Sequence, residues 1–201
     1  MTDQASYVYD AAPALNLGRR EQQEDAIAMD FAEGVDFGFI VLADGMGGHS
    51  AGDVASKIVV AEVFSRLKRL IDDPELLERH IGRIMWRAVS DANESVGKVA
   101  SESLDARGMG STLIAPVVFE NRLYWISVGD SPLYLLRGSR LYRLNEEHSL
   151  ASRMNKLVAR GLLEKDVADR HPDRDCLTSV LVGQKIPEVD CRSKPIELEP
   201  D

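Results

Sequence analysis

The chain has 201 residues, of which 44% are hydrophobic and 28% charged, so its apolar side chains suffice for one folded domain spanning residues 1–201. This composition excludes a wholly disordered or fibrous polypeptide. Lys and Arg number 24 against 33 Asp and Glu, a formal net charge of −9 that repels nucleic acid and anionic lipid and indicates neither as a partner.

Cysteine usage and hydropathy indicate where the protein functions. Cys176 and Cys191 lack the spacing of a zinc site or of a disulfide framework, so we expect reduced thiols. The longest apolar runs, Phe39–Ala43 and Leu113–Phe119, are much shorter than a bilayer-spanning helix. We therefore expect a soluble, cytoplasmic protein with no membrane partner.

The first half of the chain predicts two strands followed by two helices. Ala26–Phe31 and Phe37–Ala43 are apolar runs of strand length, and the second stops at Asp44-Gly45. A helix is expected from about residue 51 to 70, and Asp73 is a suitable N-cap for another that continues to about residue 99. Apolar residues three and four positions apart predict the buried face of the first helix: Val54, Ile58, Ala61, Phe64 and Leu67.

The second half begins with the periodicity of strands. The predicted strands are Thr112–Phe119, Leu123–Val128, Leu133–Arg137 and Arg140–Leu144, joined by hairpin-sized turns at Glu120-Asn121 and Gly138-Ser139. A helix follows over His148–Arg160, with Gly161 as its stop, and Cys176–Val182 and Ile196–Leu198 have the pattern of further strands. The class is α+β, with helices covering a sheet or sandwich.

The most informative segment for function is Asp44-Gly45-Met46-Gly47-Gly48-His49, which follows a buried strand and precedes a helix. Its glycines allow the backbone to approach an ion or phosphate closely, and Asp44 supplies a hard oxygen ligand. The alternative is a tight turn with an incidental Asp. A dinucleotide fingerprint is disfavoured because its third glycine would fall at Ser50.

Two other acidic segments lie next to predicted strands. Glu24 and Asp25 precede the first strand, and Arg20 close by has the side chain best suited to bidentate phosphate contact. Gly129-Asp130-Ser131 repeats the arrangement of an acid after a strand. Taken alone, the first segment reads as a solvated charged turn and the second as an ordinary turn. If the strands are neighbours, converging carboxylates require a cation, and oxygen ligands select Mg²⁺ or Mn²⁺.

In this order, four motifs resemble the bacterial metal-dependent protein Ser/Thr phosphatases, the PPM or type 2C family. They are Arg20-x-x-Gln23-Glu24-Asp25, Asp44-Gly45-Met46-Gly47-Gly48-His49, Gly110-Ser111-Thr112-Leu113 and Gly129-Asp130-Ser131. Leu141–Leu150 is also similar to the family's strand followed by a His-Ser segment, so the likeness spans roughly residues 15 to 183.

The resemblance implies a β-sandwich of two antiparallel sheets flanked by antiparallel helix pairs, with a dinuclear Mg²⁺ or Mn²⁺ centre. Asp44 would bridge both ions, the Gly45 carbonyl would bind one, and Glu24 and Asp25 would bind directly or through water. Asp130 matches the ligand of a third, weaker ion, and Arg20 would hold the substrate phosphate. The implied activity is hydrolysis of phospho-Ser/Thr in a protein substrate, opposing a Ser/Thr kinase, by metal-activated water and without a phosphoenzyme.

The chain departs from the family pattern most clearly at its C-terminal end. The family's Ser-Asp-Gly and Asp-Asn motifs, each with a metal-binding Asp, do not occur in it, so fewer ions are expected and the C-terminal strands are expected to be missing. We expect either a shortened form or a natural short variant, which associates through an open sheet edge. The alternative function is a pseudophosphatase that binds phosphoproteins without turnover. His49 is expected to be a polar turn residue, and His148 lacks ligand spacing.

Overall fold

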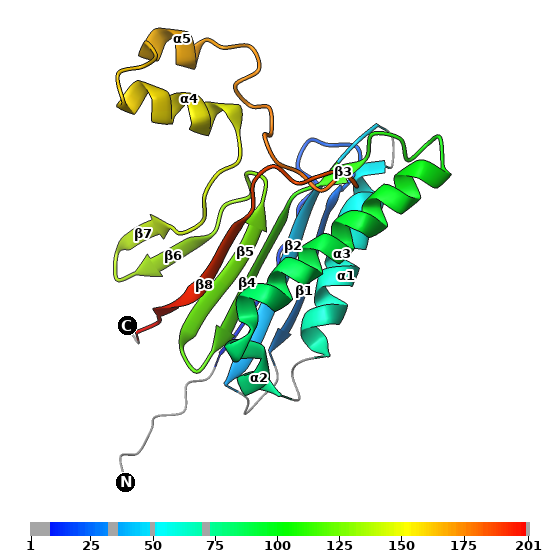
Figure 1. Ribbon diagram of the computed structural model, residues 1–201, viewed down its shortest axis with the longest axis vertical. Helices are drawn as coiled ribbons and strands as arrows, with labels where there is room; N and C mark the ends of the chain where they lie inside the picture. The colour runs from blue at the N-terminus through cyan, green and yellow to red at the C-terminus, as the bar shows by residue number, and fades with distance from the viewer. Residues whose placement is uncertain (1–8, 32–35, 49–50, 70–72, 200–201) are drawn as a thin grey trace.

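The computed structural model describes residues 9–31, 36–48, 51–69 and 73–199, and it has an antiparallel sheet with helices on one face (Figure 1). His49 and Ser50 lie outside the described residues. The sheet order is β1 (Asp25–Phe31), β2 (Phe37–Met46), β4 (Leu113–Phe119), β5 (Arg122–Val128) and β8 (Asp190–Glu197), and the short β3 (Gly110–Ser111) pairs with β2. Each strand that neighbours another in this sheet runs antiparallel to it.

Helices α1 (Ala51–Lys68) and α3 (Ile81–Glu102) cover one face of this sheet (Figure 1). Alternate residues of β2 point into that layer, as strand geometry requires, and the ring of Phe39 packs 5.2 Å from that of Phe64 on α1. The core of the layer comes from both strands and helices. Its fully buried members include Phe37, Phe39, Val41, Val59, Val63, Leu67, Met85, Val89, Leu113 and Ile126.

Two smaller units complete the fold. Strands β6 (Tyr134–Arg137) and β7 (Arg140–Arg143) form a separate two-stranded sheet, and α4 (Leu150–Ala159) and α5 (Lys165–Asp169) pack together away from the main sheet (Figure 1). The α+β class with antiparallel sheets and covering helices is confirmed. Of the second sheet, the described residues contain the β6–β7 pair.

Several local expectations are confirmed. The Asp73 side chain accepts a hydrogen bond from the Leu76 N–H at 2.9 Å, as an N-cap should. Gly161 follows α4 with a φ of +70°, a conformation that glycine adopts freely. The turn after β4 has both central residues at positive φ, Glu120 at 44° and Asn121 at 63°, which matches the right-handed twist of a hairpin.

Other local expectations are wrong. The predicted second helix is two helices, α2 (Pro74–Arg79) and α3, because the backbone leaves helical geometry at His80. Leu177 and Leu181 make isolated bridges to Ser149 and Ser111, so Cys176–Val182 is not a strand. The last strand begins at Asp190, six positions before the predicted start at Ile196.

The buried face of α1 also differs from the prediction. Ala55, Val59 and Val63 are buried, whereas Val54 is 38% exposed. Apolar residues lie on several sides of this helix, so their spacing could not select one face. Packing against β2 and α3 makes the choice.

Among the described residues, no helix combines the length and the apolar character needed to cross a membrane.

Candidate active site

Asp25 and Asp44 lie on adjacent strands at one end of the main sheet. The register of β1 with β2 places Asp25 opposite Asp44, so both carboxylates point to the same face of the sheet. Strand β2 extends to Met46, so Asp44 lies inside the strand rather than after it. The Gly45 N–H donates to the Glu24 carbonyl at 3.0 Å, which ties Glu24 to the same strand end.

The backbone of Asp44 is held on its other side by the start of β4. Its N–H donates to the Thr112 hydroxyl at 3.0 Å, and its carbonyl accepts the Thr112 N–H at 2.9 Å. The Ser111 hydroxyl donates to the same carbonyl at 3.1 Å. These contacts immobilise the peptide groups of a residue whose side chain remains exposed to solvent.

The acidic residues of the site influence the pKa of Asp44. Although Asp44 keeps solvent contact, partial burial and then the nearby charges of Asp25 and Asp130 raise the pKa of Asp44 to about 6. Arg20 acts in the opposite direction but does not cancel this effect. Asp44 therefore carries a charge that the carboxylates of Asp25 and Asp130 repel and that Arg20 does not balance.

This donor chemistry fits a divalent cation, because carboxylate oxygens are hard ligands and their repulsion would be relieved by a positive ion. Within the residues that the structure describes, however, no three His, Cys, Asp or Glu side chains converge closely enough to hold one ion. The described carboxylates are hard oxygen donors, but they do not by themselves form a complete site for one cation.

Arg20 and Glu24 form the outer side of the site. The Nη1 atom of Arg20 lies 3.9 Å from Oε2 of Glu24, and the Arg20 side chain is 81% exposed, free to meet a ligand in solvent. Glu24 packs against the beginning of α1, where a Cβ on Gly52 would lie 2.5 Å from its Oε1 atom. A side chain at Gly52 would therefore displace the Glu24 carboxylate.

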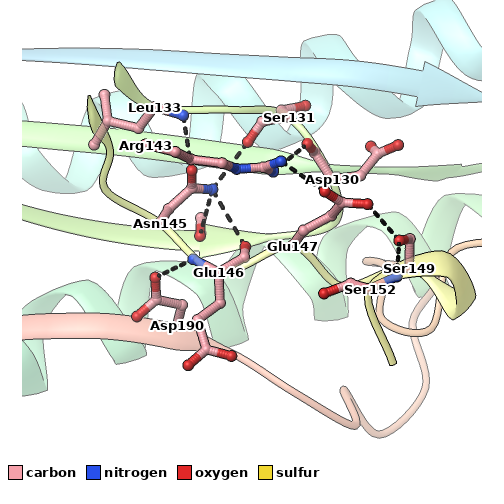
Figure 2. A network of polar contacts seen from close by, with 11 residues as sticks. Asp130, Ser131, Leu133, Arg143, Asn145, Glu146, Glu147, Ser149, Ser152 and Asp190 are labelled. Atoms are coloured by element: carbon pink, nitrogen blue, oxygen red, sulfur yellow. Dashed lines mark hydrogen bonds and ion pairs between the residues drawn. The ribbon is translucent and has the colours of Figure 1, made fainter. Parts of the chain in front are cut away.

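Asp130 is positioned by the last residue of β7 and by the segment that follows this strand (Figure 2). Its carbonyl accepts a hydrogen bond from Nη2 of Arg143 at 3.0 Å. Asn145 is buried and makes two contacts to the same loop: its amide nitrogen donates to the Ser131 carbonyl at 2.9 Å, and its oxygen accepts the Leu133 N–H at 2.7 Å. The loop that carries Asp130 is held along its length by these contacts.

His148 also supports this loop, a role that its spacing in the sequence did not indicate. His148 is 4% exposed. Its imidazole Nδ1 accepts a hydrogen bond from the Gly129 N–H at 3.1 Å, and its backbone N–H donates to the Gly129 carbonyl at 2.9 Å. Burial lowers the pKa of His148, although the neighbouring carboxylates Glu188, Asp190 and Glu146 oppose that shift. Sequence reasoning missed this role, as well as those of Gly52, Arg143 and Asn145, because each depends on contacts between distant segments.

Comparison with known proteins identifies the family. A family model described as Protein phosphatase 2C matches residues 16–165. The chain belongs to the protein phosphatase 2C family. The resemblance inferred from the four motifs is thereby confirmed.

The relatives and solved structures that it resembles include bacterial serine/threonine phosphatases. The serine/threonine phosphatase stp of Listeria welshimeri is 32% identical over 158 residues, which are 79% of this chain and 61% of that protein. The chain thus spans about three fifths of the length of this relative.

Two crystal structures of phosphatases called PstP are also similar, and the first of them is from Mycobacterium tuberculosis. One superimposes with a TM-score of 0.68 and 30% identity over 86% of this chain and 68% of that one. The other, the PstP catalytic domain in complex with two manganese ions, gives a TM-score of 0.62 and 30% identity over 86% and 66% of the two chains.

Proposed function

We propose that this chain hydrolyses phospho-Ser/Thr in proteins with a divalent metal, Mg²⁺ or Mn²⁺, and so reverses the action of a Ser/Thr kinase. The observation that carries the proposal is the pairing of Asp25 with Asp44 on adjacent strands, which puts both carboxylates on one face of the sheet, and the raised pKa of Asp44 agrees with it. A cluster of uncompensated acids on a solvent-accessible sheet end costs free energy unless a cation is bound there. Membership of the protein phosphatase 2C family supports the same chemistry.

In the proposed site, Asp44, the Gly45 carbonyl, Glu24, Asp25 and Asp130 would hold the metal, directly or through water. Metal ions in such a centre supply an activated water and polarise the phosphoryl group. Arg20 binds and orients the phosphate with its exposed guanidinium group. The rigid backbone contacts of Asp44 with Ser111 and Thr112 keep its carboxylate in place.

A second candidate function is a pseudophosphatase that binds a phosphorylated protein without turnover. It is favoured by the finding that the described residues contain no three convergent ligand side chains. In this case Arg20 and a partial metal site would recognise the phosphate, and the ion would add affinity instead of activating water.

One experiment separates the two functions. Titration of Mn²⁺ into the chain by calorimetry, together with phosphate release from a phosphothreonine peptide, measures binding and turnover on the same sample. Metal-dependent release that EDTA abolishes supports the phosphatase, and peptide binding without release supports the pseudophosphatase. Arg20→Ala should raise KM or Kd for the peptide by about tenfold, since one charged hydrogen-bonded contact is lost, and it should not weaken Mn²⁺ binding because it removes a positive charge from the site. Equal activity in EDTA would contradict the proposal.

We also propose that the chain associates with copies of itself. In the described part of the chain, β1 and β8 are the edge strands of the main sheet. Exposed apolar side chains lie on β6 and β7: Tyr134, Leu136, Leu141 and Tyr142. Open edges and apolar surface favour pairing between chains. Size-exclusion chromatography with light scattering should detect dimers at micromolar concentration, and a strictly monomeric, cooperatively folded species would contradict this expectation.

A further inference from the structure

Thr112 occupies a central place between two acidic residues of the site. Asp44 lies near the end of β2 and Asp130 follows β5, and β4 separates these two strands in the sheet. Neighbouring strands are about 4.8 Å apart, so the two backbones are roughly 10 Å from each other. Thr112 immediately precedes β4 and is therefore placed between them.

The side chain of Thr112 contacts both partners. Its hydroxyl accepts the Asp44 N–H at 3.0 Å and lies 2.8 Å from the hydroxyl of Ser131, the residue next to Asp130. Either hydroxyl can be the donor in the bond between Thr112 and Ser131, because a threonine hydroxyl that accepts one N–H keeps both a proton and a second lone pair. One buried group, 2% exposed, thus joins the strand end that bears Asp44 to the loop that bears Asp130.

The methyl group of Thr112 holds the same loop by packing. Gly129 has a φ of +104°, and a Cβ at this position would lie 2.6 Å from Cγ2 of Thr112. The loop therefore passes directly over the threonine. On its other side the loop is fixed by Arg143, Asn145 and His148, so Thr112 completes its restraint from the side of Asp44.

We propose that Thr112 is a positioning residue that sets the separation of the Asp44 and Asp130 carboxylates. The proposal rests on the proposed metal-dependent function. Ligands of a small hard cation must be held to within about 0.5 Å, and residues behind the ligands provide this precision. Ser131 is the second member of the bridge, through its hydroxyl.

Two substitutions at one position test the proposal. Thr112→Val keeps the shape of the side chain but removes the hydroxyl, whereas Thr112→Ser keeps the hydroxyl and removes the methyl. Thr112→Val should weaken Mn²⁺ binding, measured by calorimetry, by about tenfold or more, and Thr112→Ser should stay within about threefold of the parent. Ser131→Ala should weaken binding on its own but add little in the Thr112→Val background, because both changes break the same bridge.

A readout on the metal-free chain makes the test independent of turnover. Hydrogen exchange of the Asp44 amide, followed by NMR, should accelerate by about tenfold in Thr112→Val and remain near the parent rate in Thr112→Ser. If the parent binds Mn²⁺ and Thr112→Val binds it equally well, the bridge has no positioning role, although the proposed function stands.

If the parent itself neither binds Mn²⁺ nor releases phosphate, the proposed function fails. If the Asp44 amide in Thr112→Val also exchanges at the parent rate, the positioning role of Thr112 is wrong as well. Should Thr112→Val not fold, as judged by circular dichroism, Ser131→Ala tests the same bond. Parent-like Mn²⁺ affinity in Ser131→Ala would then contradict the proposal.

Discussion

The two ends of the main sheet both carry charged clusters, but the clusters are built in opposite ways. At the end near α2, Glu78 receives hydrogen bonds from Nε and Nη2 of Arg122 at 2.5 and 3.0 Å, and another from the Tyr124 hydroxyl. Burial acts to raise the pKa of Glu78, yet the bonds from Arg122 and Tyr124 outweigh it and leave that pKa lowered.

At the other end of the sheet the charges repel. Burial and the carboxylates of Asp25 and Asp130 raise the pKa of Asp44 to about 6, and Arg20 compensates only in part. The contrast teaches how to separate structural from functional acids in this fold. A carboxylate that its neighbours neutralise stabilises the chain, whereas one that they leave uncompensated is a candidate for ligand binding.

The two ends of the sheet should differ most in metal binding when a carboxylate at each end is changed to the corresponding amide. Asp44→Asn removes a proposed metal ligand, so Mn²⁺ affinity and phosphopeptide hydrolysis should fall by more than about 100-fold. This loss is larger than the loss typical of replacing a residue that only orients a metal ligand. Glu78→Gln is the matched control and should leave Mn²⁺ affinity within about twofold. Calorimetric titration measures both, and parent-like binding by Asp44→Asn would remove Asp44 from the proposed centre.

The effects on stability should have the opposite order. Glu78→Gln loses charge-assisted bonds to Arg122, whose side chain is 26% exposed, and should lower the free energy of unfolding by about 2 kcal/mol. Urea denaturation in EDTA measures this change. A loss below about 0.5 kcal/mol would show that the Glu78 cluster is no more than an ordinary surface ion pair.

Asp44→Asn should stabilise the metal-free chain, since it removes one of the repelling charges. The gain should be only about 0.5 kcal/mol, because Asp44 keeps solvent contact that screens the repulsion. Urea denaturation with EDTA at neutral pH is again the measurement. If Asp44→Asn lowers the free energy of unfolding, the Asp44 carboxylate makes a stabilising contact within the chain, which would contradict the prediction.

The smallest expected effect is a dependence on pH from His148. Burial lowers the pKa of His148 in the folded chain. When the pH falls through the ordinary histidine range near 6.5, the unfolded chain therefore binds a proton at His148 more readily than the folded chain does. Stability is therefore complete above that range and falls on acidification, by at most about 1.4 kcal/mol per pH unit. His148→Asn keeps an acceptor for the Gly129 N–H and should lose this component when urea midpoints at pH 7.5 and 5.5 are compared. An equal slope in parent and variant would contradict the prediction.

Much of the fold could be predicted from local patterns. Phe37–Ala43 and Leu113–Phe119 indicated strands because each is a continuous apolar run of strand length. The break at His80 and the rotated face of α1 could not be predicted, because packing between elements selects them. The isolated bridges of Leu177 and Leu181 could not be predicted either, because their partners are distant in the chain.

The sequence by itself determined the chemistry available to this protein. It placed acids at Glu24, Asp25, Asp44 and Asp130 next to strands, in motifs specific enough to indicate the protein phosphatase 2C family. Only the tertiary structure decided that Asp25 faces Asp44 and that Thr112 and His148 hold the elements around them. The physical reason is that residue type is a local property, whereas repulsion between carboxylates and hydrogen bonds between segments exist only once the sheet brings distant parts of the chain together.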